Sequence, residues 1–272
     1  MRGDDFLVWR KARKGAAGEK AISDRFDLSG KVALISGASG GLGAHFAAVL
    51  AAANAHVLLA ARRADHLEAQ AAAIRARGGQ CETLSLDVTD SASIAAIAPS
   101  LATVDILINN AGVVREAMAL DHSEADWDAV IDTNLKGMFL LAQATAKAMQ
   151  ARKAAGSIIN IASVLGLRQA ASVLSYAVSK AGAIQLTKTL ALELARYGIR
   201  VNALAPGYLD TELNGDFWNS EGGKAMIKRI PQRRLGTLAD LDGPLLLLAS
   251  DASAFMTGSV ITVDGGHAVN SL

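Results

Sequence analysis

The stretch VALISGASGGLG, residues 32–43, joins a short apolar run to a turn rich in glycine. The continuous apolar run predicts a strand buried on both faces of a parallel sheet, and the residues up to about Asn54 predict the helix that follows. Between a strand and a helix, such a turn is typical of a phosphate-binding loop. Gly37 permits the tight exit from the strand, Gly41 lets the backbone approach a pyrophosphate, and Gly43 lets the helix lie close to the sheet. Taken alone, the turn is also compatible with a purely structural role, and the absence of a Gly-Lys-Ser/Thr ending argues against a P-loop NTPase.

Further apolar runs recur along the chain, and helical stretches separate most of them. They predict strands at residues 56–61, 81–86, 106–109, 157–161, 200–205 and 259–263, with long helices at 124–149 and 175–197. Strands joined by helices of this length need right-handed crossovers, so the pattern predicts an α/β fold. We expect a Rossmann-type doubly wound parallel sheet of about seven strands in a single domain, with ligands at the carboxyl ends of the strands. Residues 207–234 are predicted to form one long irregular region, which in a compact domain is usually functional.

The first 25 residues differ from the rest because they are charged and show no sustained periodicity. We therefore expect residues 1–25 to be a flexible N-terminal extension and residues 26–272 to be a dinucleotide-binding catalytic domain. A transit peptide is the alternative for this extension, and Asp4 and Asp5 argue against it.

The composition excludes several classes of protein. The formal net charge is +1, so nothing indicates nucleic acid or an acidic membrane surface as a partner. Cys81 is the single cysteine, which excludes an internal disulfide framework and a cysteine-cluster metal site, and we expect no bound metal. No apolar stretch reaches the roughly 18–20 residues of a membrane span, and no signal peptide is recognisable. We therefore expect a cytoplasmic protein.

The end of the second predicted strand bears on the choice of coenzyme. An NAD site usually has a carboxylate there for the ribose 2′-hydroxyl, whereas a nearby basic residue accommodates a 2′-phosphate. This strand ends in Ala61, followed by Arg62 and Arg63, and has no acid at that place. A guanidinium offers a planar pair of donors to phosphate oxygens, so NADP(H) is preferred over NAD(H). A solvated arginine at the start of a helix is the alternative.

Three polar residues suggest the chemistry. Tyr176 and Lys180 lie four residues apart at the start of an apolar helix, so they share a face, and Ser163 follows the fifth predicted strand. A phenol has an ordinary pKa near 10, so proton transfer near pH 7 requires about three units of lowering. A nearby ammonium and the positive charge of an oxidised nicotinamide are suitable sources.

Taken together, these motifs resemble those of the short-chain dehydrogenase/reductase family over nearly all of residues 26–272. Each motif by itself is weak evidence for the family, whereas the occurrence of all of them in the order of the family makes the resemblance specific. Ser36 stands where the family has Thr, and it keeps the hydroxyl. The matching motifs are Ser36-Gly37-Ala38-Ser39-Gly40-Gly41-Leu42-Gly43, Asn109-Asn110-Ala111-Gly112, Thr133-Asn134-Leu135, Ser163, Tyr176-Ala177-Val178-Ser179-Lys180, Pro206-Gly207 and Asp264-Gly265-Gly266.

The resemblance implies a role for each matched residue. Tyr176 would act as general acid in reduction and general base in oxidation, while Lys180 would lower its pKa and bind the nicotinamide ribose. Ser163 would hold the substrate oxygen, and Asn134 would anchor a proton-relay water. Asp87 and Val88 would meet the adenine. The predicted cofactor-binding residues are Gly37, Ser39, Gly41, Leu42, Gly43, Arg62, Arg63, Asp87, Val88, Asn109, Ala111, Gly112, Tyr176, Lys180, Pro206 and Gly207.

The function expected from this set is an NADP-dependent oxidoreductase (EC 1.1.1.-) that interconverts a small carbonyl compound and a secondary alcohol. An isomerase or dehydratase of the same fold and a non-catalytic NADP-binding sensor are the alternatives. The intact set of Ser163, Tyr176, Lys180 and Asn134 argues against a sensor. The family contains 3-oxoacyl-carrier-protein reductases and sugar or polyol dehydrogenases, and the sequence does not separate them.

The region after Gly207 is predicted to grip the substrate through apolar side chains: Tyr208, Leu213, Phe217, Trp218 and Met226. Its cations fit either an anionic substrate or, with greater weight, a solvated helix face: Lys224, Lys228, Arg229, Arg233 and Arg234. The helices at 127–149 and 176–197 are apolar around much of their circumference. Since the family commonly forms tetramers through two long helices, a homotetramer or homodimer is expected, although burial within one subunit gives the same pattern.

Overall fold

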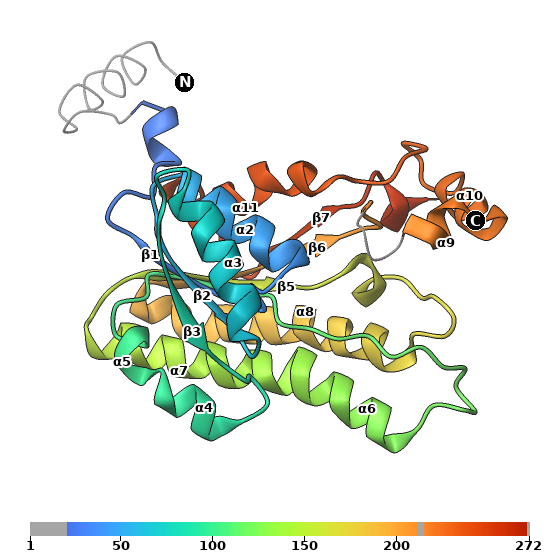
Figure 1. Cartoon of the computed structure of the whole chain (residues 1–272), viewed down its shortest axis with the longest axis horizontal. Coiled ribbons are helices and arrows are strands. Elements are labelled where there is room, and N and C mark those ends of the chain that lie inside the picture. Colours follow the sequence, from blue (N-terminus) through green and yellow to red (C-terminus); the bar gives the residue numbers. More distant parts are fainter. Residues whose placement is uncertain (1–20, 211–214, 271–272) are drawn as a thin grey trace, which may run out of the picture.

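Seven parallel strands run through the centre of the molecule in the order β3-β2-β1-β4-β5-β6-β7 (Figure 1). The structure is a computed structural model, and it describes residues 21–210 and 215–270. The first strand pairs with both β2 and β4, so the strand order reverses at this point and opens a crevice at the carboxyl ends of β1 and β4. The strands are β1 (Val32–Ser36), β2 (His56–Ala61), β3 (Gln80–Ser85), β4 (Ile106–Asn109), β5 (Gly156–Ile161), β6 (Ile199–Pro206) and β7 (Val260–Val263).

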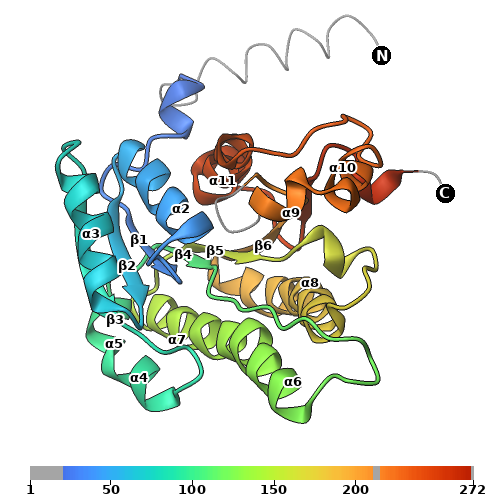
Figure 2. The same cartoon turned by 45° about the vertical axis from the view of Figure 1, so that its right-hand side comes forward.

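Helices cover both faces of the sheet (Figure 2). Side chains alternate along β1: Ala33 and Ile35 join the core beneath α2, whereas Leu34 joins the core beneath α7. This two-sided burial explains the continuous apolar sequence of the strand. One face carries α2 (Gly41–Ala52), α3 (Ala64–Arg75) and α11 (Asp242–Ala249), and the other carries α4 (Ser91–Ala96), α5 (Ala98–Leu101), α6 (Glu124–Ile131), α7 (Gly137–Ala151) and α8 (Leu174–Leu194).

The predicted doubly wound sheet is confirmed, with strand ends displaced by one residue at most. The helix predicted at residues 124–149 is interrupted by a π turn, η3 (Asp132–Lys136), and ends at Ala151. The prediction of an irregular region at 207–234 is wrong in part, because it contains α9 (Gly215–Asn219) and α10 (Glu221–Ile227). Two glycines inside α10 and the shortness of both helices hide the helical pattern.

The two edges of the sheet differ in character. Strand β3 alternates exposed polar residues with buried ones, since Gln80 and Glu82 face solvent and Cys81 is buried. Strand β7 shows no such alternation, and its apolar residues, including Val260 and Ile261, are only half-buried. Within the described residues, β7 pairs with β6 alone.

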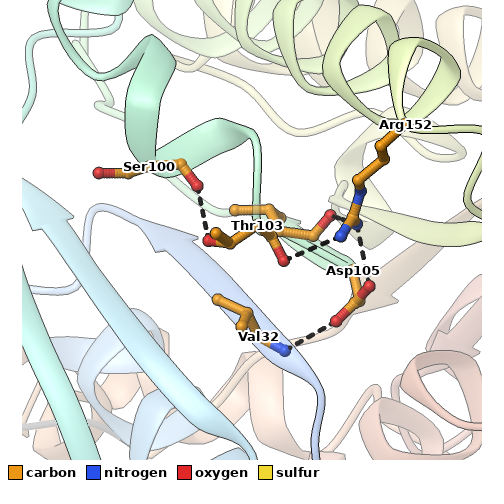
Figure 3. A network of polar contacts seen from close by, with 6 residues as sticks. Val32, Ser100, Thr103, Asp105 and Arg152 are labelled. Atoms are coloured by element: carbon orange, nitrogen blue, oxygen red, sulfur yellow. Dashed lines mark hydrogen bonds and ion pairs between the residues drawn. The ribbon is translucent and has the colours of Figure 1, made fainter.

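A polar network joins three elements at the amino end of the sheet, opposite the crevice (Figure 3). One carboxylate oxygen of Asp105 accepts a hydrogen bond from the backbone N–H of Val32 at 3.0 Å, and the other pairs with Arg152 at 2.9 Å. The guanidinium also donates to the carbonyls of Thr103 and Val104. The network therefore ties the starts of β1 and β4 to the residue that follows α7.

The predicted N-terminal extension lies mostly outside the described residues, which begin at Ala21. Its last residues form a short 3-10 helix, η2 (Ser23–Arg25). Across the described part of the chain, none of the helices has the length and apolar character to span a membrane. In the same residues, no group of three or more His, Cys, Asp or Glu side chains is arranged to hold a metal ion.

Candidate functional site

A cleft of about 960 Å³ lies along the carboxyl ends of the strands. It is lined by the glycine turn after β1, the residues that follow β2, β3 and β4, and the start of α8. Most of the predicted site residues meet here: Gly37, Ser39, Gly41, Leu42, Arg62, Arg63, Asp87, Val88, Ala111, Gly112, Ser163, Tyr176, Lys180, Pro206 and Gly207.

The glycine turn is held open at one position and packed tightly at two others. Gly37 and Gly41 have φ angles of +70° and +54°, which disfavour residues with a side chain. A Cβ on Gly37 would lie 2.9 Å from the Cα of Ala111, and one on Gly43 would overlap the carbonyl of Gly37. At Gly41 nothing lies within 4 Å, so the backbone there is open to a ligand.

The helix that follows the turn begins without a protein group to neutralise its positive end. Gly40 is the N-cap of α2 and provides no side-chain acceptor, and no acidic residue stands in the first turn. The first backbone N–H groups of this helix therefore have no side-chain cap at the edge of the cleft. Such an end suits the pyrophosphate of a dinucleotide.

Two arginines stand where the ribose of a dinucleotide is expected. Arg63 donates to the hydroxyl of Ser39 at 2.9 Å, which fixes it over the glycine turn. Arg62, which is exposed, lies 4.0 Å from Asp87. Burial raises the pKa of Asp87, but the backbone N–H and hydroxyl of Thr89, followed by Arg62, outweigh it, so the pKa is lowered overall. The carboxylate is therefore ionised, and its distance of 4.0 Å from Arg62 is at the upper limit for an ion pair.

The three chemical residues come from two neighbouring elements. Ser163 follows β5 and caps the 3-10 turn η4 (Val164–Gly166), since its hydroxyl accepts the N–H of Leu165 at 3.1 Å. Tyr176 and Lys180 lie on the first turns of α8, with the ammonium 5.5 Å from the centre of the phenol ring. Ser163 lies close enough to Tyr176 for its hydroxyl to influence the pKa of the phenol.

The electrostatics of these residues differ from the expectation for Tyr176. Burial raises the pKa of this phenol, the hydrogen bond with Ser163 opposes the rise, and Tyr208 adds to it. Lys180 is 4 % exposed and donates to the carbonyl of Ile161 at 2.7 Å. Burial lowers the pKa of Lys180 to about 8. The groups of the chain by themselves therefore do not lower the pKa of Tyr176.

Asn134 lies behind the cleft, in the π turn between α6 and α7, and is fully buried. Its Oδ1 accepts the N–H of Val113 at 2.8 Å, and its Nδ2 donates to the carbonyl of Val113 and to the hydroxyl of Ser179. Since Ser179 also donates to the carbonyl of Tyr176 at 2.7 Å, Asn134 connects the loop after β4 to the turn that carries the phenol.

Two of the predicted cofactor-binding residues, Gly43 and Asn109, do not line the cleft. Gly43 lies inside the first turn of α2, against Gly37. The buried Asn109 donates to the carbonyl of Met138 and to Asn160, at 3.1 Å each, so its side chain points away from the cleft. Both positions shape the cleft from behind.

Sequence reasoning did not identify the residue that clamps the glycine turn. Asn110 donates from Nδ2 to the carbonyls of Ser36 and Gly37, at 3.0 and 3.3 Å. The hydroxyl of Ser36 in turn accepts the N–H groups of Asn110 and Ala111. The Asn109-Asn110-Ala111-Gly112 motif was the only available signal, and it does not say which asparagine side chain faces the turn.

Apolar residues form the wall of the cleft near Ser163 and Tyr176. The loops after β4 and β5 run side by side there, joined by a bridge between Ala117 and Val173. The apolar residues that line this part, none of them predicted, are Val113, Val114, Leu165, Val173 and Leu209.

The region predicted to grip the substrate is only partly described. Leu213 lies outside the described residues. Tyr208 packs edge-on against Trp218, with ring centres 5.5 Å apart, and Phe217 packs against Trp218 in the same way. Two of the predicted cations are paired in ion pairs, Lys224 with Glu221 and Arg234 with Asp240.

Comparison with known proteins agrees with this geometry. A family model described as short chain dehydrogenase matches residues 31–222. The gluconate 5-dehydrogenase of Gluconobacter oxydans is 38% identical over 252 residues, which are 91% of this chain and 98% of that protein. The 3-oxoacyl-[acyl-carrier-protein] reductase of Thermotoga maritima is 37% identical over 243 residues, with coverages of 88% and 98%.

Solved structures give the same result. A gluconate 5-dehydrogenase from Burkholderia cenocepacia, in complex with NADP and tartrate, superimposes with a TM-score of 0.88 at 36% identity, covering 92% of this chain and all of that one (100%). A putative 2-deoxy-D-gluconate 3-dehydrogenase from Agrobacterium tumefaciens with bound NADP gives 0.84 at 40% identity, with coverages of 90% and 98%.

Proposed function

Because the chain belongs to the short-chain dehydrogenase/reductase family, we propose that it is an NADP-dependent oxidoreductase that interconverts a carbonyl compound and a secondary alcohol by hydride transfer. One observation carries the proposal: Ser163, Tyr176 and Lys180 line the same cleft as the open glycine turn. A proton donor, a holder of the substrate oxygen and a phosphate-binding turn are the parts that such a reaction requires.

The coenzyme fits the residues present. The uncapped positive end of α2 and the open backbone at Gly41 would hold the pyrophosphate, and Arg62 and Arg63 would hold the 2′-phosphate. Lys180 would hold the nicotinamide ribose from inside the cleft. When bound, the nicotinamide accepts or supplies the hydride, and its oxidised form adds a positive charge to the cleft.

The residues of the chain move the proton and hold the oxygen. In reduction, Tyr176 gives its phenolic proton to the substrate oxygen, and in oxidation the phenolate takes it back. The hydroxyl of Ser163 donates a hydrogen bond to the same oxygen as negative charge develops there. The ammonium of Lys180, 5.5 Å from the centre of the phenol ring, would favour the phenolate together with the positive charge of the oxidised nicotinamide, against the rise that burial imposes on the pKa of Tyr176. The side-chain N–H groups of Asn134 already donate to the carbonyl of Val113 and to Ser179. Asn134 would therefore anchor the relay water through one of its own oxygen atoms.

The preference for NADP(H) depends on Arg62. Changing Arg62 to Gln is expected to raise the KM for NADPH by about 10- to 100-fold, since it removes a charge-assisted hydrogen bond to phosphate. The KM for NADH, which lacks that phosphate, is expected to change by less than about twofold. Steady-state kinetics with both coenzymes measure the difference. Arg77→Gln, at an exposed position beyond α3, is the matched control. An equal change for NADPH and NADH would show that Arg62 acts on the fold rather than on the phosphate.

The reaction class is tested by a substrate panel of polyols, sugar acids, simple ketones and 3-oxoacyl thioesters, each with NADPH or NADP⁺. Conversion of substrate with one coenzyme consumed per product formed is the expected result. An isomerase or dehydratase would convert substrate without net coenzyme change. A sensor protein would bind the coenzyme and convert nothing. Relatives acting on sugar acids and polyols by name, such as the D-threitol dehydrogenase of Mycolicibacterium smegmatis, make small polyhydroxy compounds the first class to assay.

We also propose that the chain assembles as a homotetramer or homodimer. Helices α7 and α8 carry apolar side chains that are partly exposed, among them Phe139 (37 %), Val178 (42 %) and Leu192 (81 %). Apolar residues gathered on long helices support burial against a second copy.

A further inference from the structure

Arg168 is half-buried and has no carboxylate partner within residues 21–210 and 215–270. It follows Leu165, which lines the cleft, on the loop between η4 and α8. One amino group donates to the carbonyl of His267 at 2.6 Å and lies 3.5 Å from that of Asn270. Among the described residues, it makes no ion pair, and its Nε and second amino group make no hydrogen bond. A half-buried guanidinium with free donors is suited to bind an anion.

Two ring nitrogens on neighbouring aromatic residues have no partner in the part of the chain that the structure describes. The indole N–H of Trp218, in a side chain that is only 8 % exposed, and the Nδ1 of His267 are both buried, and neither has a hydrogen-bond partner among the described residues. The ring of Tyr208 stands between them, 5.5 Å from Trp218 and 5.4 Å from His267. Buried polar atoms usually have partners, so such unpaired donors mark a place where a ligand would supply acceptors.

This group of residues adjoins the reacting end of the cleft. Tyr208 follows Gly207, which lines the cleft, and it is close enough to influence the ionisation of Tyr176. In Figure 1, residues 267–269 lie together with α9 and α10 at one end of the molecule, beyond the carboxyl ends of β6 and β7. A substrate with its oxygen at Tyr176 would therefore extend past the apolar wall toward Tyr208 and the three donors.

Among the described residues, the charged groups that influence His267 are two arginines and one carboxylate. Burial lowers the pKa of His267, Arg168 lowers it further, Asp264 opposes the change, and Arg229 adds to it. Both oxygens of Asp264 already accept backbone N–H groups, from Gly266 and Ala268. The local carboxylate is thus engaged, whereas Arg168 keeps free donors.

We propose that Arg168, together with Trp218 and His267, forms the subsite for a carboxylate at the end of the substrate remote from the reacting carbon. The substrate class is a small hydroxy acid, with its oxo acid as the product of oxidation. This assignment rests on the proposed oxidoreductase function and narrows it.

The test compares acids with neutral molecules of the same skeleton, namely D-gluconate with D-glucitol and D-galactonate with galactitol, all with NADP⁺. The wild-type chain is expected to have a higher kcat/KM for the acid of at least one pair. Arg168→Met is expected to reduce the acid-to-neutral ratio by about 10- to 100-fold, as the loss of a charge-assisted hydrogen bond predicts. Arg168→Lys keeps the charge and is expected to restore most of the ratio. Arg77→Met, at the exposed position beyond α3, is the control and is expected to leave the ratio unchanged.

The possible results distinguish a failure of the carboxylate subsite from a failure of the proposed oxidoreductase function. If Arg168 only tethers the C-terminal residues, Arg168→Met lowers kcat/KM for acid and neutral substrates equally, and the carboxylate subsite is wrong. Preference for the neutral member of every pair, or turnover of 3-oxoacyl thioesters alone, also overturns it while leaving the oxidoreductase function intact. Absence of coenzyme turnover with the whole panel would instead overturn the proposed function.

Discussion

Replacing Tyr176 by Phe is expected to lower kcat by at least about 10³-fold, equivalent to ~4 kcal/mol of lost transition-state stabilisation. The substitution removes only the phenolic hydroxyl, which Ser163 contacts, and it keeps the ring that packs 5.5 Å from the ammonium of Lys180. NADPH is therefore expected to bind with a dissociation constant within about threefold of the native value, since phosphate recognition lies at the other end of the cleft.

Two measurements separate chemistry from binding in this variant. Coenzyme oxidation measures kcat with the best substrate of the panel, and titration calorimetry measures NADPH affinity. Tyr197→Phe removes a hydroxyl from the 3-10 turn that extends α8, away from the cleft, and is the matched control with near-native kcat. Activity of Tyr176→Phe within about tenfold of wild type would rule out Tyr176 as the acid-base group.

Replacing Lys180 by Met is expected to change activity and stability in opposite directions. The ammonium lies 5.5 Å from the centre of the phenol ring, and two charges at about that separation interact by ~3 kcal/mol at an effective dielectric constant near 20. Loss of the ammonium is therefore expected to raise the pKa of Tyr176 by about two units. Oxidation needs the phenolate, so the limb of the pH profile on which activity rises with pH is expected to move upward by about the same amount. Near neutral pH this displacement alone reduces kcat/KM by about 100-fold, and weaker ribose binding reduces it further.

Stability should increase because the buried ammonium opposes folding. Burial lowers the pKa of Lys180 from 10.5 to about 8, so the unfolded chain binds more protons than the folded chain between these two pH values. The contribution of Lys180 to stability therefore rises with pH through this window and is least favourable below it. Near neutral pH, Lys180→Met is expected to gain about 1–3 kcal/mol of unfolding free energy, after the lost hydrogen bond to Ile161 is counted.

Urea unfolding and pH profiles of kcat/KM test both parts. Lys188→Met, an exposed position two turns further along α8, controls for the loss of one lysine from this helix. An unshifted pH profile in Lys180→Met would contradict the electrostatic role. A large loss of stability near neutral pH would show that the ammonium has a buried partner besides the carbonyl of Ile161.

The sheet was predictable from the sequence because its strands are local apolar runs separated by helices. Parallel strands bring their carboxyl ends to one edge, so Ser163, Tyr176 and the glycine turn could be placed together without contact information. The π turn at Asn134 could not, because one extra residue per turn leaves no periodic signal over so short a segment.

Contacts between distant residues were also beyond the sequence. The clamp of Asn110 on Gly37 joins positions 73 residues apart in the chain, and that of Arg168 on His267 joins positions 99 apart. Neither spacing has a local pattern, and both depend on how the loops meet above the sheet. The pKa of Tyr176 is a similar case: the neighbouring lysine was visible, whereas the burial that opposes it appears only in the folded chain.

The unequal edges of the sheet affect how the protein behaves when it is produced. An edge strand exposes a row of unpaired backbone N–H and C=O groups, which can template pairing with other chains. Exposed polar residues such as Gln80 and Glu82 disfavour the pairing of β3 with another chain, whereas the half-buried apolar residues of β7 do not. If a second copy covers β7, a variant that cannot assemble would accumulate as aggregate rather than as an active single subunit. Loss of yield would then mark a defect in assembly even where the cleft is intact.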